Sequence, residues 1–140
     1  MSDRFFLDTN IFAYSLDKSA PKKAIRAADL IRTAVETRRG IVSYQVVQEF
    51  LNVVLLKSTI TMSHIDAEQY LETIFRPLLV VFPSLDLYAQ ALHLASRRRL
   101  PWYDSLIVAS AIEGQCAVLF SEDFQNGQEF GNLRIENPFL

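Results

Sequence analysis

The sequence has 140 residues, of which 50% are hydrophobic and 21% charged, and its formal net charge is −2. This composition is typical of a folded globular protein, and the length fits one domain over residues 1–140. No apolar run reaches the roughly 18 residues of a membrane span, and residues 1–10 do not resemble a signal peptide. Because Cys116 is the only cysteine, no internal disulfide can form, and we expect a cytoplasmic protein without a membrane segment.

Short apolar runs alternate along the chain with helical patterns. In chain order, the expected elements are a strand at 4–7, a helix start at 11–14, a helix at 22–39, a strand at 41–43, helices at 44–57 and 63–75, a strand at 78–82, helices at 84–99 and 104–113, and strands at 117–120 and 133–135. Gly40, Pro77 and Gly114 are expected to end helices. We expect 133–135 to be an edge strand. Strands separated by helices predict an α/β fold with a mainly parallel sheet of four to five strands.

One predicted helix, Tyr44–Lys57, is more apolar than a surface helix. Its apolar side chains cover more than one face, so it is expected to lie at the centre of the fold or to bind a partner. Val54 and Leu55 are the positions at which we expect partner binding. Glu49 interrupts the apolar run in its first half.

Four acidic residues interrupt or end apolar elements, and we call them the acidic quartet: Asp8, Glu49, Asp104 and Asp123. Three lie at strand ends or helix starts, and ligand sites in open parallel sheets form outside the carboxyl ends of the strands. Each acid alone has another interpretation, since Asp8 and Asp104 can be helix caps, Asp123 a turn residue and Glu49 a solvated helix residue. Their shared placement beside buried elements favours one common site.

Converging carboxylates repel one another, so a site of this kind predicts a bound cation. Oxygen ligands without nearby cysteine or histidine favour Mg²⁺ or Mn²⁺, and the two histidines, His64 and His93, are expected on helix surfaces. Such an ion would polarise a phosphoryl oxygen and activate water. The net charge does not argue against a nucleic-acid substrate, because the surface without the quartet would carry +2.

Four short motifs carry a resemblance to a known family. They are LDTNIF at Leu7–Phe12, QEF at Gln48–Phe50, WYDSLIVASA at Trp102–Ala111 and SEDF at Ser121–Phe124. In this order and spacing they resemble the acidic motifs of the PIN domain and, more narrowly, of VapC-type toxins of bacterial toxin–antitoxin pairs. The resemblance covers essentially the whole chain and implies a PIN-like α/β/α sandwich.

The resemblance also implies an Mg²⁺- or Mn²⁺-dependent endoribonuclease with the acidic quartet as its catalytic residues. Asp8, Asp104 and Asp123 would hold one metal ion, while Glu49 would reach a water on that ion or a second ion. A homodimer is implied, together with a cognate antitoxin whose C-terminal segment lies over the active-site groove. Asn10, and Ser121 at the end of a strand, are expected to support the site.

The last motif contains two adjacent acids, Glu122 and Asp123. Side chains alternate along a strand, so Ser121 and Asp123 share one side while Glu122 points away. We therefore prefer Asp123 as the fourth acid.

Several residues are candidates for holding RNA. Arg97, Arg98 and Arg99 precede Asp104 and can contact the RNA backbone, or can instead serve as cations at a helix C-terminus. A second, weaker basic group consists of Lys22, Lys23 and Arg26. Trp102 and Tyr103 can stack on bases, but packing in the core is the favoured interpretation.

Two other functions are compatible with parts of this pattern. A phosphatase would use Asp8 as a covalent nucleophile, but that chemistry usually requires a second acid two residues on, where this chain has Asn10. A binding module that keeps the fold without the activity would be favoured by an incomplete quartet. The quartet is complete, so RNA hydrolysis is the preferred function.

Overall fold

A computed structural model of the chain describes residues 3–56 and 60–140. In chain order its elements are β1 Phe5–Leu7, α1 Thr9–Ser15, α2 Pro21–Thr37, β2 Gly40–Ser43, α3 Tyr44–Leu55, α4 His64–Tyr70, η1 Leu71–Phe75, α5 Arg76–Leu78, β3 Leu79–Val81, α6 Leu85–Arg98, α7 Trp102–Glu113, β4 Val118–Phe120, β5 Glu129–Phe130 and β6 Leu133–Glu136. Lys57, the last residue of one predicted helix, lies outside the described residues. No helix within the described ranges is long and apolar enough to span a bilayer.

The described strands form one sheet in the order β3-β2-β1-β4-β6-β5. All neighbouring pairs are parallel except β5 with β6. At the centre, β1 pairs with both β2 and β4, and Leu7 lies opposite Phe120. The predicted α/β fold with a mainly parallel sheet is therefore confirmed, with six strands in place of four to five.

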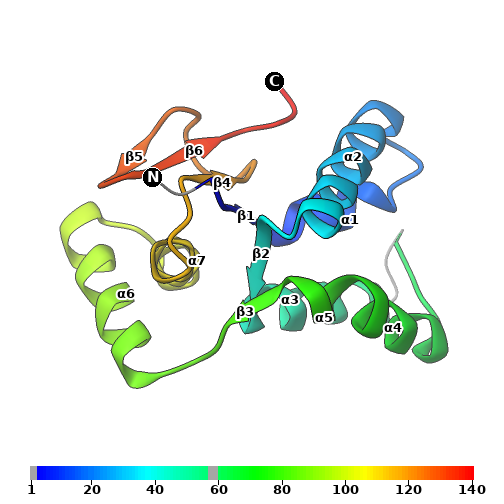
Figure 1. Cartoon of the computed structure of the whole chain (residues 1–140), viewed down its shortest axis with the longest axis horizontal. Coiled ribbons are helices and arrows are strands. Elements are labelled where there is room, and N and C mark those ends of the chain that lie inside the picture. The colour runs from blue at the N-terminus through cyan, green and yellow to red at the C-terminus, as the bar shows by residue number, and fades with distance from the viewer. Residues whose placement is uncertain (1–2, 57–59) are drawn as a thin grey trace.

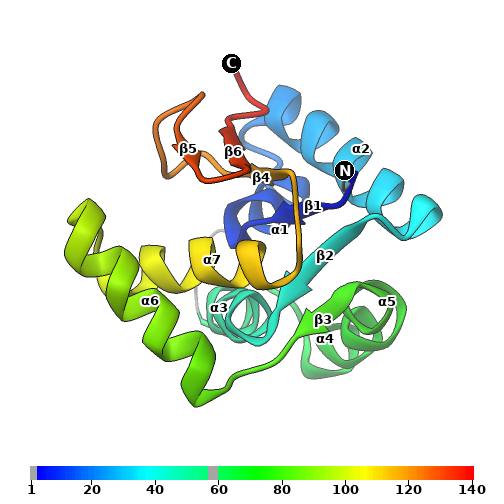
Figure 2. The same ribbon diagram turned by 60° about the vertical axis from the view of Figure 1, so that its left-hand side comes forward.

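Helices flank this sheet on two sides (Figure 1). In that view α1 and α2 lie to one side of β1 and β2, while α7 lies on the other side with α6 beyond it. Figure 2 shows α6 crossing the outer side of α7, and these two helices are in extensive contact. Helix α3 packs against both α1 and β2. This arrangement explains why nearly every residue of α7 from Ser105 to Ala111 is buried.

The core is continuous from the central strands into the helices. Phe6, Leu7, Ile41 and Val42 are almost completely buried, as expected for strands covered on both faces. Beside them, aromatic rings of α1, α3, α4 and η1 pack together: Phe12, Phe50, Tyr70 and Phe75 have ring centroids 4.7–6.3 Å apart. Burial of these apolar surfaces holds α1 and α3 in place, and both helices carry residues of the acidic quartet or its neighbours.

The expected end of the second helix at Gly40 is wrong. The helix ends at Arg38, which adopts a left-handed conformation with φ 58° and donates its N–H to the carbonyl oxygen of Ala34. Gly40 instead begins β2, where α2 lies so close that a Cβ would be 2.2 Å from the Cβ of Ala34. The glycine is required by this close contact, not by a helix end.

The expected helix end at Pro77 is also wrong. The helical segment that begins at His64 continues through η1, where the Arg76 N–H bonds to the carbonyl of Leu71, five residues earlier. Pro77 then lies in the first turn of α5, a position at which a missing N–H is tolerated. The helix therefore ends at Leu78, one residue after the proline.

The expectation that residues 133–135 form an edge strand is wrong as well. β6 pairs parallel with β4 on one side and antiparallel with β5 on the other, so β5 is the edge. With two residues, β5 is too short to give a recognisable pattern in the sequence. Gly131, with φ 61°, lies in the turn that joins it to β6.

The apolar excess of α3 serves mostly to fill the core. Val46, Phe50 and Val54 have no exposed surface, whereas Tyr44 and Leu55, at the two ends of the helix, are exposed. The expectation that Val54 binds a partner is therefore wrong, and α3 is a central helix. Leu55, which is 42% exposed, remains available on the surface.

We predict that Val54→Asp lowers the free energy of unfolding by about 3 kcal/mol or more, because it buries an unpaired carboxylate. Leu55→Asp, at the adjacent exposed position, should change it by no more than about 1 kcal/mol. Urea unfolding of both variants followed by circular dichroism measures this difference. Equal stabilities would contradict the central position of the helix.

Candidate functional site

Asp8 and Ser121 lie side by side at the carboxyl ends of two paired strands. The Asp8 N–H bonds to the carbonyl of Phe120, continuing the pairing of β1 with β4 by one residue. The Ser121 hydroxyl donates to Oδ2 of Asp8 at 2.7 Å, and the Thr9 N–H donates to Oδ1 at 2.7 Å. Both oxygens of this nearly buried carboxylate, which is 4% exposed, therefore have a defined orientation.

Glu49 reaches the same region from α3 through two neighbouring side chains. The Thr9 hydroxyl donates to Oε1 of Glu49 at 2.7 Å. Gln45, one turn earlier on α3, donates from Nε2 to Oε2 of Glu49 at 3.4 Å and to the carbonyl of Tyr103 at 3.1 Å. Because Thr9 follows Asp8 and Tyr103 precedes Asp104, Glu49 is linked to the neighbourhood of both acids.

Asp123 and Asp104 complete the group from two further segments. Asn10 donates from Nδ2 to Oδ2 of Asp123 at 3.1 Å, and the Asp123 N–H donates to the Ser121 hydroxyl at 3.1 Å. Asp104 is the third residue of α7, whose N-cap position is Pro101. The interpretation of Asp104 as an N-cap is therefore wrong, although its charge lies in the first turn, where a helix dipole favours an acid.

The four carboxylates influence one another electrostatically. Burial raises the pKa of Asp8 to about 7; the hydrogen bonds from Ser121 and Thr9 oppose this increase, and the charges of Asp123 and Glu49 add to it. The pKa of Asp104 is also raised, by burial first and then by the charges of Asp123 and Glu49. No lysine or arginine in the described part of the chain forms an ion pair with any member of the quartet. The site is therefore a region of unbalanced negative charge.

The chemistry of these donors fits a hard divalent cation. The donors are carboxylates, together with the amide oxygens of Asn10 and Gln45, which are buried and accept no hydrogen bond from the described residues. A cation would lower the repulsion that raises the pKa of Asp8. As the side chains stand in the described ranges, no three acidic, histidine or cysteine residues are close enough to share one ion.

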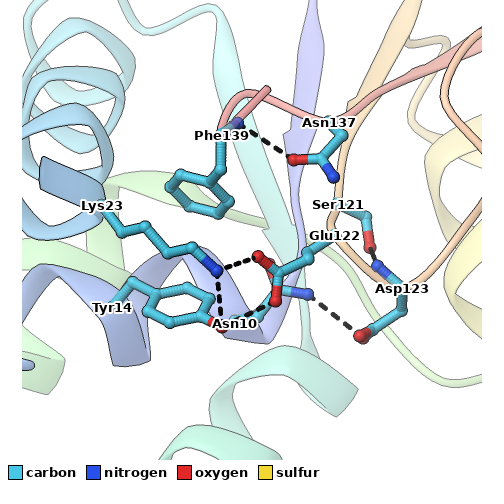
Figure 3. A network of polar contacts seen from close by, with 8 residues as sticks. All are labelled: Asn10, Tyr14, Lys23, Ser121, Glu122, Asp123, Asn137 and Phe139. Carbon is cyan, nitrogen blue, oxygen red and sulfur yellow. Dashed lines mark hydrogen bonds and ion pairs between the residues drawn. The ribbon is translucent and has the colours of Figure 1, made fainter. Parts of the chain in front are cut away.

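Glu122 and Asp123 point in different directions (Figure 3). β4 ends at Phe120, so Ser121, Glu122 and Asp123 lie beyond the strand and the expected strand alternation does not apply to them. Asp123 nevertheless lies beside Asn10, whereas Glu122 turns toward Tyr14 and Lys23. Burial alone would raise the pKa of Glu122, but the hydrogen bonds from Lys23 and Tyr14 hold it below its usual value. The charge of Glu122 is thus balanced, and that of Asp123 is not.

The basic residues considered for RNA binding are placed differently from one another. Arg98 lies with its guanidinium 4.3 Å over the ring of Phe130 and donates to the carbonyl of Glu129, so it packs against β5. Arg97 and Arg98 line a groove of about 1060 Å³ between α6, α7 and β6, and Arg99 is an exposed residue with φ 54°. None of the three forms an ion pair with the acidic quartet within the described residues.

The other residues considered for RNA binding also differ in their surroundings. Lys22 is exposed, Lys23 pairs with Glu122, and Arg26 donates to the carbonyl of Pro138. Trp102 is partly buried against the core as expected. Tyr103 is 65% exposed, so the expectation that it packs in the core is wrong.

Three residues near the quartet were not anticipated as site residues: Thr9, Gln45 and Tyr14. Gln45 lies four positions before Glu49, and this helical spacing is a usable signal because it places both on one face. Thr9 is the first residue of α1, and its position in the sequence indicates a helix start but not a site residue. Tyr14 and its partner Lys23 carry no local signal, since they meet Glu122 from about a hundred residues away.

Comparison with known proteins gives two kinds of match. The sequence profile of the PIN domain matches residues 5–126. No curated protein matches the sequence. PIN domains are generally nucleases.

Three solved structures share the fold, each at 16–20% sequence identity. A toxin–antitoxin complex from Klebsiella pneumoniae is 16% identical with a TM-score of 0.64, covering 95% of this chain and 96% of that one. VapBC2 from Rickettsia felis, bound to a DNA fragment from its promoter, is 19% identical with a TM-score of 0.64, covering 95% and 97%. FitAB bound to an IR36 DNA fragment is 20% identical with a TM-score of 0.65, covering 97% and 96%.

We predict that the protein in chelator loses stability as the pH rises from about 4 to about 7. Asp8 has a pKa near 3.8 when unfolded and about 7 when folded, so the folded state holds the proton more tightly in this window. The free energy of unfolding should fall by up to about 1.4 kcal/mol per pH unit. Urea unfolding at several pH values measures the slope.

Asp8→Asn should flatten this slope, whereas the control Asp86→Asn, at an exposed position in the first turn of α6, should preserve it. An unchanged slope in Asp8→Asn would contradict the raised pKa.

Proposed function

Because the chain belongs to the PIN domain family, we propose that it is an Mg²⁺- or Mn²⁺-dependent endoribonuclease and the toxin of a toxin–antitoxin pair. Cleavage of RNA phosphodiester bonds is the proposed reaction, in the cytoplasm. The catalytic residues are the acidic quartet, supported by Asn10 and Ser121.

One observation carries this proposal: carboxylates from four separate segments affect each other's charge at one edge of the sheet. The raised pKa values of Asp8 and Asp104 both include contributions from Asp123 and Glu49. Carboxylates gathered without a cationic side-chain partner are unfavourable for folding, and such clusters occur at functional sites. A cation-dependent site accounts for a cluster that folding alone would disfavour.

Each residue has a role that follows from its contacts. Asp8, Asp104 and Asp123 would hold the ion, which supplies polarisation of a phosphoryl oxygen and activation of water. Ser121 and the Thr9 N–H orient the two oxygens of Asp8. Thr9 and Gln45 hold Glu49, which would reach a water on that ion or a second ion.

Two protein partners complete the proposal. The three similar structures are described as a toxin–antitoxin complex and as VapBC2 and FitAB bound to DNA, which supports a cognate antitoxin as partner. We propose that a segment of this antitoxin covers the acidic site. Exposed aromatic side chains surround a groove of about 340 Å³: Tyr44, Phe82, Tyr88 and Tyr103. Aromatic residues are enriched in protein interfaces, and we assign this surface to a second copy of the chain.

We predict that Asp8→Asn abolishes RNA cleavage while the fold is retained. Loss of a metal-binding oxygen should lower the rate by about a thousandfold, or about 4 kcal/mol of transition-state stabilisation. Cleavage ends in total RNA, mapped with Mg²⁺ present, measure the loss, with Asp86→Asn as the matched control. Wild-type cleavage by pure Asp8→Asn protein would refute the nuclease function.

A second prediction tests Asp104 through stability. Mg²⁺ at about a hundred times its dissociation constant should stabilise the wild type by about 2.7 kcal/mol, because it binds the folded state. Asp104→Ala should gain much less from Mg²⁺. In chelator it should differ little from wild type, because relief of repulsion offsets a dipole contribution of about 0.3–1 kcal/mol. Thermal melts of both proteins give the comparison, and identical responses to Mg²⁺ would exclude Asp104 from the site.

A further inference from the structure

Three consecutive residues after β4 each form a side-chain contact with a distant part of the chain. Ser121 donates to Asp8 after β1, and Asp123 accepts from Asn10 on α1. Between them, Glu122 accepts hydrogen bonds from Tyr14 on α1 and Lys23 on α2, each at 2.6 Å. In Figure 3 the side chain of Glu122 points toward Tyr14 and Lys23, while that of Asp123 points toward Asn10.

The contacts of Glu122 form a closed group, which we call the Glu122 clamp: Tyr14, Lys23 and Glu122. One carboxylate oxygen of Glu122 accepts from the Tyr14 hydroxyl, and the other pairs with the Lys23 ammonium. Lys23 also lies 3.3 Å from the Tyr14 hydroxyl and 4.5 Å above the Tyr14 ring. Phe139 packs edge-on against Tyr14 and lies 5.6 Å from the Lys23 ammonium, while the ion pair itself stays partly exposed.

Asp123 needs such support because its own position is electrostatically unfavourable. Its side chain is exposed, and its charge repels those of Asp8 and Asp104. Within the described residues, the one hydrogen bond to its carboxylate comes from Asn10 at 3.1 Å. A free carboxylate in this position would turn away from the other acids into water.

We propose that Glu122, held by Tyr14 and Lys23, is a positioning residue that keeps the segment 121–123 in place and Asp123 turned toward the acidic site. Tyr14 and Asn10 lie one helical turn apart on α1, so the same helix holds both adjacent acids. The role in catalysis rests on the proposed function, whereas the role in holding the segment does not.

The first test needs neither metal nor RNA. Hydrogen–deuterium exchange of the peptide 121–126 should be faster in Glu122→Gln, Tyr14→Phe and Lys23→Met than in the wild type, because the Asp123 N–H depends on the position of Ser121. Exchange in α6 should not change, which checks that each variant is folded. Lys22→Met, which removes the same charge from the adjacent exposed position, is the control and should exchange like the wild type. Unchanged exchange in all three clamp variants would overturn the proposal.

The second test measures the consequence for the site. Calorimetric titration with Mn²⁺ should show about tenfold weaker binding in each clamp variant, as is usual when a residue supporting a ligand is removed. The value of kcat should fall by a similar factor with KM unchanged. The double variant Lys23→Met/Glu122→Gln should be no worse than Glu122→Gln, because both changes break one contact.

Other outcomes identify competing roles. A raised KM in Lys23→Met alone would show that Lys23 binds RNA, and complete inactivity of Glu122→Gln with normal Tyr14→Phe and Lys23→Met would show that Glu122 is itself the fourth acid. Either result overturns the positioning role. If the wild type binds no Mn²⁺ and cleaves no RNA, the proposed function fails, and the exchange measurement alone decides whether the clamp holds the segment.

Discussion

The parallel pairing of β1 with β4 is the constraint on which the site depends. It places Leu7 opposite Phe120, so that Asp8 and Ser121 leave the sheet together and meet through a 2.7 Å hydrogen bond. Phe6 and Leu7 point to opposite faces of the sheet and have no exposed surface, so packing on both faces holds β1 at the centre. Core packing therefore determines the position of the polar site.

Packing of the helices against the core brings Glu49 and Asp104 to the same edge of the sheet. Burial of Val46, Phe50 and Val54 holds α3 against α1 and β2, and this leaves Glu49 facing the start of α1. α7 is buried along most of its length, so its first turn is held beside the sheet edge together with Asp104. Opposed to this packing are the burial of acidic groups and, after it, their mutual repulsion, which together raise the pKa values of Asp8 and Asp104. The apolar core thus supplies the stability against which the charged site is assembled.

Much of the fold could be predicted from the sequence because its elements have strong periodic patterns. The parallel order of strands and helices, the helix starts near residues 63 and 84, and the surface positions of His64 and His93 agree with the structure. What could not be predicted depends on contacts between distant segments. The left-handed Arg38, the continuation of the helix past Pro77 and the two-residue β5 are each set by packing that the local sequence does not record. The sequence indicates the four acids because each interrupts or ends an apolar run. The distances between them cannot be predicted in this way, because they depend on how distant segments pack.

The adjacent acids Glu122 and Asp123 show how distant contacts decide function where sequence alone cannot. The two differ by one methylene and occupy successive positions, so composition gives no reason to assign them different roles. The two side chains point in different directions beyond the end of β4, and Lys23, from a helix near the start of the chain, balances the charge of Glu122. Asp123 faces other carboxylates and one amide, so its charge is left without a cationic side-chain partner in the described residues. A divalent cation binds most strongly where negative charge is both fixed in position and unpaired. The Glu122 clamp contributes to both conditions, because it pairs the charge of Glu122 away from the site and holds Asp123 within it.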